Sequence, residues 1–237
     1  MKNTAILFTT ILATPLWALP PCNDQSSEFW DQCFGEFSYP SGDQYSGEWK
    51  NDLHHGYGTY IWANGDTYTG MWMENMQHGQ GFKTWNSGER RGDVYSGQWL
   101  NNIQHGKGVY KWVSGDQYIG AVMNGMPHGE GTYIFGNGDF FRGNVKFGSL
   151  SGEGVFTWRN GNQYIGAYLD SKGHGYGVLL VTRDFLSKST DWHYRKGDRY
   201  LGEWRQDRFD GTGTYYHADG RIQSGKWKSH EFQKNVE

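Results

Sequence analysis

The stretch Tyr45-Ser46-Gly47-Glu48-Trp49 decides the fold, because it returns along the chain at nearly constant intervals. It recurs as Tyr68-Thr69-Gly70-Met71-Trp72 and as Tyr95-Ser96-Gly97-Gln98-Trp99. Later copies, the last of them degenerate, open at these positions: Tyr118, Phe141, Tyr164, Tyr200 and Gln223. Most copies start 23 residues after the previous one, and insertions of 4 and 13 residues lengthen two of the steps. A fixed period of this size is typical of a stacked array in which no unit is stable alone.

Alternation within each copy predicts the local structure. Tyr45, Gly47 and Trp49 fall on one face of a strand, and Ser46 and Glu48 fall on the other. Glycine normally weakens a strand, so we expect these glycines to leave room for a neighbouring ring. Aromatic side chains would then cover the glycines of adjacent units.

Two further elements recur between the copies. A His-Gly-x-Gly element opens at His55, His78, His105 and His128, and its later versions open at Ser151, His174 and Asp210. A turn element follows as Asn64-Gly65-Asp66, Ser114-Gly115-Asp116 and Asn137-Gly138-Asp139. Each unit is therefore predicted to be a β-hairpin, and the Gly-Asp element is predicted to turn the chain into the next unit.

The composition supports an all-β fold. The 237 residues include 36 glycines, and 17% of the chain is aromatic. Many glycines with many rings favour strands and tight turns over helical bundles, and the aromatic content is too high for a disordered chain. The net charge of −3 lacks the basic excess that binding to a nucleic acid backbone requires, so no nucleic acid partner is expected.

The first residues have the features of an export signal. Lys2 precedes the apolar run Thr4–Trp17, and Ala18 is a suitable cleavage residue, so residues 1–18 are predicted to be a cleaved signal peptide. The mature protein would be periplasmic or extracellular. Cys22 and Cys33 would then meet an oxidising compartment, which predicts a disulfide between them. Two cysteines supply too few ligands for a zinc site.

The repeated residues resemble the MORN (membrane occupation and recognition nexus) family. Its pattern is Tyr-x-Gly-x-Trp, a short turn, His-Gly-x-Gly, and Gly-Asp before the next Tyr. The resemblance implies an elongated, twisted array of antiparallel hairpins. Members include membrane-junction proteins, cytoskeletal scaffolds, and accessory regions of lipid kinases and methyltransferases, so the resemblance implies no one activity. Three central units depart from the pattern by replacing the Trp with Val122, Val145 and Tyr168.

This resemblance and the signal together divide the chain. We expect an N-terminal cap at 19–36, the array at 37–228 with insertions near 86–93 and 182–197, and a C-terminal tail at 229–237.

The recurring polar residues do not form a known catalytic or metal-binding motif. If the hairpins stack in register, the histidines at 55, 78, 105, 128 and 174 lie about 10 Å apart, which is too wide for two of them to share a metal. We expect them to act as turn residues that bond to neighbouring backbone groups, with a proton-sensing or loose metal-binding edge as the alternative. The aspartates at 66, 93, 116, 139 and 198 are expected in turns. No enzyme, cofactor or metal is predicted.

Two sets of residues are candidates for binding. The first is a platform of rings, unless these rings cover glycines instead: Trp49, Trp62, Trp72, Trp85, Trp99 and Trp112. The second is the longer insertion, because loops on rigid scaffolds often carry function: Arg183, Lys188, Trp192, His193, Tyr194, Arg195 and Lys196. A variable, solvated loop is the alternative for the insertion.

The sequence therefore predicts a non-enzymatic, exported scaffold that mediates protein–protein interaction along an extended β surface. The alternative is peripheral binding to membrane lipid or cell-wall glycan through the rings and the basic insertion. The identity of the protein partner stays open. Exposed edges at the ends of an array also allow pairing into a homodimer.

Overall fold

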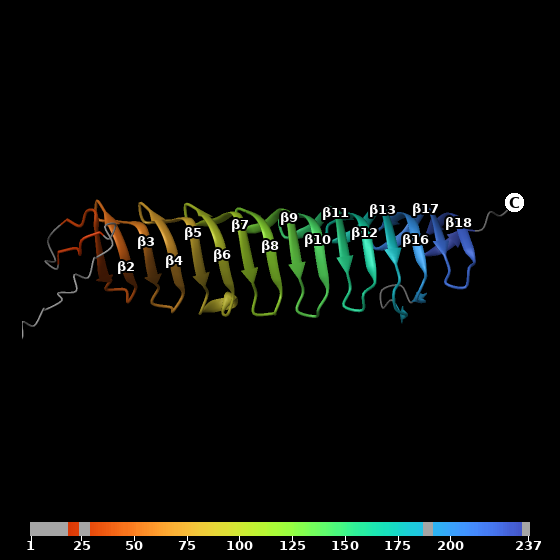
Figure 1. The fold of residues 1–237 in the computed structure, drawn as a ribbon, viewed down its shortest axis with the longest axis horizontal. Coiled ribbons are helices and arrows are strands. Elements are labelled where there is room, and N and C mark those ends of the chain that lie inside the picture. The colour runs from red at the N-terminus through yellow and green to blue at the C-terminus, as the bar shows by residue number, and fades with distance from the viewer. Residues whose placement is uncertain (1–18, 24–28, 187–191, 234–237) are drawn as a thin grey trace, which may run out of the picture.

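The computed structural model describes residues 19–23, 29–186 and 192–233. They form one long antiparallel sheet of 17 strands, in which each strand pairs with the next strand of the sheet along the chain (Figure 1). The predicted all-β array of antiparallel hairpins is confirmed. The predicted signal peptide at 1–18 lies outside the described residues.

Strands of two lengths alternate along the array. Seven-residue strands carry the Tyr-x-Gly-x-Trp element: β2 Gln44–Lys50, β4 Thr67–Met73, β6 Val94–Leu100, β8 Gln117–Met123, β10 Phe140–Lys146, β12 Gln163–Leu169, β16 Arg199–Arg205 and β18 Ile222–Lys228. Nine-residue strands carry the His-Gly-x-Gly element: β3 Leu53–Ile61, β5 Met76–Thr84, β7 Ile103–Lys111, β9 Met126–Ile134, β11 Ser149–Thr157, β13 Lys172–Leu180 and β17 Arg208–Tyr216. The end strands are β1 Cys33–Ser38 and β19 Glu231–Gln233.

The strand pairing extends past the boundaries expected for the array. β1 lies partly within the expected cap at 19–36, and β19 lies within the expected tail at 229–237. The two insertions form η1 Gly88–Arg90 and the two-stranded ribbon of β14 Phe185–Leu186 with β15 His193–Tyr194. Both insertions lie on the same edge of the array, at its lower side in Figure 1.

Two kinds of turn connect the strands. Asn51 and Asp52 both have positive φ angles, 53° and 59°, and form the two-residue turn between β2 and β3. Such a turn matches the right-handed twist of a hairpin, and Asn and Asp tolerate its backbone. The predicted Gly-Asp turn between units is confirmed: Trp62 N–H donates to the Asp66 carbonyl at 3.0 Å.

Each Gly-Asp turn also holds the next one. The Asp43 carboxylate accepts the Ala63 N–H at 2.7 Å, and the Asp66 carboxylate accepts the Asn86 N–H at 2.8 Å. The same contact recurs from Asp93, Asp116, Asp139, Asn162 and Asp198. The aspartate ladder is therefore a series of links between neighbouring turns, and its expected role in turn structure is confirmed.

A row of glycines crosses the sheet from β1 to β18. Gly35 pairs with Gly47, Gly47 with Gly58, Gly58 with Gly70, and the pairing continues in the same way to Gly225. Most of the seven-residue strands also have a register shift just after their glycine. Such bulges bend strands, and the sheet curls about its long axis (Figure 1).

The tyrosine that opens each copy covers these glycines. A methyl group at Gly58 would overlap the Tyr45 ring, and the same holds for Gly81 under Tyr68. The Tyr45 hydroxyl donates to the Glu48 carbonyl at 3.0 Å. Phe141 lies at the same position without a hydroxyl and is equally buried, so the position requires the ring. The prediction that strand glycines make room for rings is confirmed.

The copies thus have an inner face, which carries the covering rings, and an outer face. The inner-face tyrosines that open the copies are among the most deeply buried side chains: Tyr45, Tyr68, Tyr95, Tyr118 and Tyr200. On the same face, the indole Nε1 of Trp72 donates to the Gly58 carbonyl of the preceding unit at 3.1 Å.

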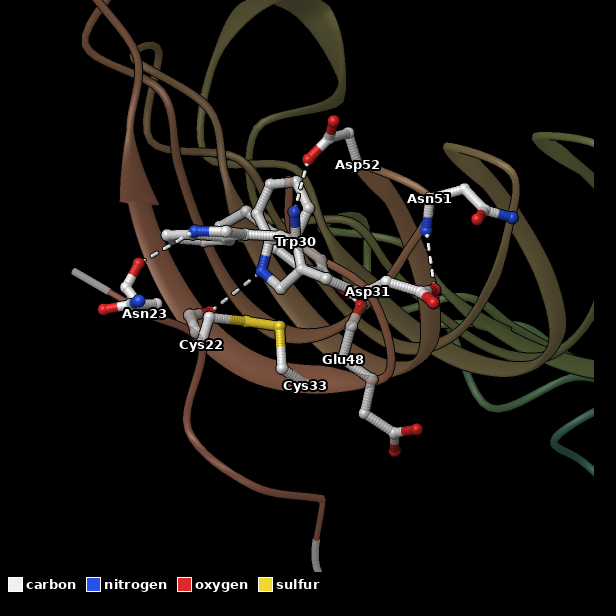
Figure 2. The surroundings of a disulfide bond; sticks show 11 residues. Cys22, Asn23, Trp30, Asp31, Cys33, Glu48, Asn51 and Asp52 are labelled. Carbon is white, nitrogen blue, oxygen red and sulfur yellow. Dashed lines mark hydrogen bonds between the residues drawn. A yellow bond between two sulfur atoms is a disulfide. The ribbon is translucent and has the colours of Figure 1, made fainter. Parts of the chain in front are cut away.

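The N-terminal segment closes the row at its first glycine (Figure 2). The predicted Cys22–Cys33 disulfide is present, and a methyl group at Gly35 would meet Cys22 and the Trp30 ring, which lies edge-on to Trp49 at 4.9 Å. Backbone hydrogen bonds of 2.8 Å join Cys22 N–H to the Phe34 carbonyl and Phe34 N–H to the Pro20 carbonyl. The segment therefore covers part of the edge strand β1.

The histidine ladder differs from its predicted place. His55 and its counterparts lie inside the nine-residue strands and are half-buried, rather than in turns. The following Gly56 has a φ of +57°, so the His-Gly pair forms the bulge that bends the strand.

Two other histidines are buried at the two ends of the array. Nε2 of His54 lies 2.8 Å from the Tyr39 hydroxyl, and Nε2 of His230 lies 2.9 Å from the Tyr194 hydroxyl. Burial lowers the pKa of each to about 4, and in His230 the charge of Arg208 adds to this effect. Both side chains therefore pack as neutral imidazoles.

Acid is expected to weaken the array through these two histidines. Their folded pKa lies below the ordinary value of about 6.5, so between pH 6.5 and 4 the unfolded chain takes up protons first and stability falls as the pH falls. Each histidine should cost roughly 2–3 kcal/mol at pH 4. Urea unfolding at both pH values measures the loss.

The double variant His54→Gln, His230→Asn places at each position a residue that other units carry there, namely Gln77 and Asn75. It should lose less stability on acidification than the wild type, while the exposed-site control His193→Gln should behave as the wild type. An equal loss in the double variant and the wild type would contradict this account.

Candidate functional site

A line of stacked rings and cations runs along the inner face on the side of the Gly-Asp turns. At its N-terminal end, the Tyr60 and Trp62 ring centroids are 4.7 Å apart. Lys83 Nζ lies 4.2 Å from the centroid of the Trp62 ring, and the Arg90 guanidinium lies 3.6 Å from that of Trp85. Burial lowers the pKa of Lys83. Arg90 belongs to the shorter insertion, which therefore packs onto this line.

The line continues through the central units. Tyr110 stacks on Trp112 at 5.3 Å, Phe135 lies 5.7 Å from Phe156, and Phe156 lies 5.1 Å from Trp158. These rings come from the second half of each nine-residue strand and the turn after it. Stacked and tilted ring pairs at these distances stabilise by about 0.5–1.5 kcal/mol each beyond their burial.

The line is interrupted in the unit that opens at Tyr164. In this unit Leu179 pairs with Tyr164. In the first unit the corresponding pair is Tyr60 with Tyr45, so Leu179 stands where the first unit has a ring. Gly173 likewise occupies the position that Phe209 fills in the next unit. This unit therefore carries Leu where most other units carry a ring, and no side chain where the other units carry one.

A cavity of about 870 Å³ opens at this interruption. Its lining is mostly aromatic and aliphatic: Leu150, Phe156, Trp158, Tyr164, Tyr168, Leu179, Phe185, Leu186, Tyr194 and Trp204. Polar residues lie among them: Asn137, Asp139, Arg159, Asn160, Asn162, Ser171, Asp207 and His230. Sites for small molecules and for anchoring side chains likewise combine apolar walls with polar groups.

Five titratable groups of the lining have shifted pKa values: Tyr164, Tyr168, Tyr194, Asp207 and His230. Burial raises the pKa of the Tyr168 phenol, which therefore stays protonated and able to donate. Burial also raises the pKa of the Asp207 carboxyl, although the Gly173 N–H donates to it at 2.7 Å.

The longer insertion forms the C-terminal side of the cavity. Phe185 of β14 stacks on Tyr194 of β15, with ring centroids 4.5 Å apart. The Tyr194 hydroxyl contacts Nε2 of His230, and Trp192 lies against the rings of Phe209 and Trp227. In its described residues, the insertion thus attaches its rings to the units that follow it, and the cavity lies in front of these rings.

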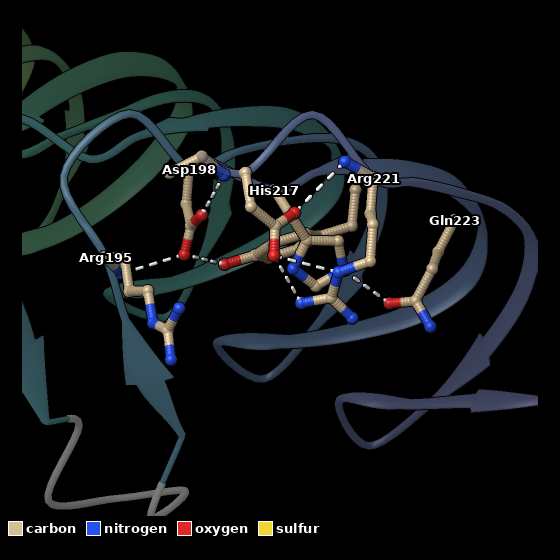
Figure 3. A network of polar contacts seen from close by, with 8 residues as sticks. Arg195, Asp198, His217, Arg221 and Gln223 are labelled. Atoms are coloured by element: carbon tan, nitrogen blue, oxygen red, sulfur yellow. Dashed lines mark hydrogen bonds and ion pairs between the residues drawn. The ribbon is translucent and has the colours of Figure 1, made fainter.

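A buried carboxylate fastens the insertion to the next turn (Figure 3). Asp198 accepts hydrogen bonds from the Tyr215 hydroxyl at 2.6 Å and from the Arg195 N–H at 2.7 Å. It also accepts the Ala218 N–H at 2.7 Å, as its counterparts do in the other turns. Beyond it, Arg221 pairs with Asp219 and His217 with Gln223.

The residues predicted to bind differ in burial, and some of them are not exposed. Trp49, Trp72 and Trp99 are buried, so their side chains do not contribute to an exposed platform. Trp85 is also buried, whereas Trp62 and Trp112 are half-buried in the line of rings.

In the insertion, Arg183, His193, Arg195 and Lys196 are exposed, Trp192 is half-buried and Tyr194 is buried. Lys188 lies outside the described residues. Sequence reasoning did not select the cavity residues of the preceding units, although Gly173 and Leu179 stand out once the copies are aligned.

The described ranges lack two further features, a metal-binding cluster and a membrane-spanning helix. No three His, Cys, Asp or Glu side chains in them gather closely enough to hold a metal ion. They contain no helix that is long and apolar enough to cross a membrane.

A protein-family model for the MORN repeat matches seven segments of the chain: residues 45–67, 68–90, 95–117, 118–140, 141–163, 164–180 and 200–220. A comparison with curated proteins finds no match.

The solved structures that match include the G-box domain of the microcephaly protein CPAP, which is 13% identical, has a TM-score of 0.43, and aligns over 82% of this chain and 99% of that one. The TCP10 domain of Danio rerio CPAP in complex with a STIL peptide is 13% identical, with a TM-score of 0.42 over 81% and 82% of the two chains. A streptogramin B lyase is 10% identical, with a TM-score of 0.18 over 82% and 68%.

Replacing Asp198 by Ala is expected to loosen the insertion. Three donors would lose their acceptor, which should cost about 1–3 kcal/mol locally. Amide hydrogen exchange should therefore accelerate at residues 192–198 and 215–218 and stay unchanged at 67–134. Asp43→Ala is the matched control, because it removes the equivalent contact at the first turn and should leave the insertion protected. Unchanged exchange in the insertion of Asp198→Ala would contradict this role.

Proposed function

Because the chain belongs to the MORN repeat family, we propose that it is a non-enzymatic, exported scaffold that binds a partner protein on its inner face. The observation that carries the proposal is the cavity at the interruption of the ring line, where the repeat pattern is broken and an insertion supplies one side. A repeat scaffold with one specialised position is typical of a recognition surface.

Export is supported by the disulfide between Cys22 and Cys33, since such bonds persist in oxidising compartments. In this proposal the mature protein acts in the periplasm or outside the cell. The apolar, ring-rich lining favours a protein partner, because aromatic anchors in pockets dominate protein interfaces.

Membrane lipid is the weaker candidate. Arg183, Arg195 and Lys196 are exposed in the insertion, but Asp184 lies among them and accepts the Lys196 N–H. Acidic side chains next to the cations reduce the attraction to anionic headgroups, which depends on a cluster of uncompensated positive charge.

Site-directed photo-crosslinking in producing cells tests the proposal. A photoreactive phenylalanine at Leu186, a cavity residue that is 61% exposed, should form a covalent adduct with one partner polypeptide. The matched control at Tyr176, which is 66% exposed on the outer face, should not form that adduct.

An excess of the same protein without the photoreactive residue should compete for the partner and reduce the yield of the adduct. Adducts of the same kind from both positions, or none from Leu186, would contradict the proposal. Salt-sensitive pelleting of the purified protein with anionic vesicles, in the absence of an adduct, would instead support the lipid alternative.

A further inference from the structure

We propose that the cavity binds a tyrosine or tryptophan side chain of the partner, whose ring enters the interruption and whose polar atom hydrogen-bonds to the Tyr168 hydroxyl. This inference rests on the proposed function and adds the chemistry of the group that is recognised. It depends on a gap in the line of rings and on one unused polar group beside that gap.

The unused polar group is the hydroxyl of Tyr168, a side chain that is only 7% exposed and lines the cavity. Other buried phenols of this region are bonded: Tyr164 donates to the Ala167 carbonyl at 3.0 Å, and Tyr215 donates to Asp198. Within the described part of the chain, Tyr168 has no hydrogen-bond partner. Its oxygen is not sealed from solvent, so a ligand atom that enters the cavity can take the place of water there.

Tyr168 is also a departure from the repeat. Most units carry Trp here, and the Trp204 indole donates to the Gly177 carbonyl of the preceding unit at 3.1 Å. The Tyr168 ring keeps the packing of that position through edge contacts with Phe141 and Tyr164, at 5.3 and 5.1 Å. Its donor, however, is available to the cavity instead of being used within the sheet.

Rings bound the cavity on two sides. Phe156 and Trp158 end the line that arrives from the preceding units, and Phe185 and Tyr194 form a stacked pair in the insertion. Leu179 lies in the sequence between these two pairs and is aliphatic, so no ring joins one pair to the other at this position. A planar aromatic group in this gap would gain ring contacts with both pairs, worth about 0.5–1.5 kcal/mol for each ring pair.

The two features together select the ligand. A sugar carries a hydroxyl on most carbons, and it would place several of these against the ten aromatic and aliphatic residues that share the lining with the polar ones. An acyl chain would leave the Tyr168 hydroxyl unpaired. A phenol or an indole has one ring and one polar atom, which matches both features. The volume of 870 Å³ exceeds one side chain, which leaves room for the residues that flank it in a polypeptide.

A titration of the mature protein with blocked amino acids tests this inference, and the NMR chemical shifts of the protein report the binding. N-acetyl-tyrosinamide and N-acetyl-tryptophanamide should bind at the cavity and shift its resonances, and N-acetyl-leucinamide should bind at least fivefold more weakly. Tighter binding of leucinamide, palmitate or an N-acetylglucosamine oligomer at the cavity would overturn the assignment.

Two variants locate the contacts. Tyr168→Phe removes the hydroxyl alone and should weaken tyrosinamide about 3- to 10-fold without changing leucinamide. Leu179→Tyr restores the ring that Tyr60 and Tyr133 supply in other units, so it should fold, fill the gap and weaken both aromatic probes more than tenfold. Tyr176→Phe, on the outer face, is the control and should bind as the wild type.

Equal binding by Tyr168→Phe and the wild type would overturn the role of the hydroxyl. If the aromatic probes fail to bind while the Leu186 adduct persists, this inference is wrong and the proposed scaffold function stands. If the adduct is absent as well, both are wrong.

Discussion

An aromatic ring lying over a cross-strand pair of glycines is the contact on which the rest of the structure depends. In the first unit the Tyr45 ring occupies the space that side chains at Gly47 and Gly58 would need. Because the glycines pair with one another across neighbouring strands, each unit repeats the contact and extends the same row. At the two ends of the array, other side chains cover the glycines. Trp30 and the disulfide cover Gly35, and Phe232 covers Gly225.

This contact also explains where a binding site can form. The rings over the glycine row are buried and leave little choice of side chain, whereas the second line of rings, near the Gly-Asp turns, tolerates change. Lys83 replaces a tyrosine there and keeps the line closed by contacting two tryptophans. Leu179 opens it instead, Gly173 removes a side chain at the other end of the same strand, and the longer insertion lies beside the resulting cavity. A specialised site thus arises without disturbing the array.

Much of this fold could be predicted from the sequence, because local rules generate it: the alternation of Tyr45 and Trp49 with polar residues, the strand glycines, and the Gly-Asp turns. The place of His55 could not, since a bulge at Gly56 depends on pairing with both neighbouring strands. The burial of Trp72 was one of the two roles that the sequence allowed for its tryptophans. The cavity escaped prediction because it results from missing side chains, which single-copy patterns do not reveal.

A double-mutant cycle on one covering ring and one glycine tests the central claim most directly. Gly131 lies beneath the Tyr118 ring, where a methyl group would overlap it. Gly131→Ala and Tyr118→Ala should each destabilise the array by about 2–4 kcal/mol in urea unfolding. The account predicts that the double variant is no less stable than Tyr118→Ala alone, because the methyl group then enters space left by the ring. Strictly additive losses would show that the ring and the glycine act independently and would contradict the account.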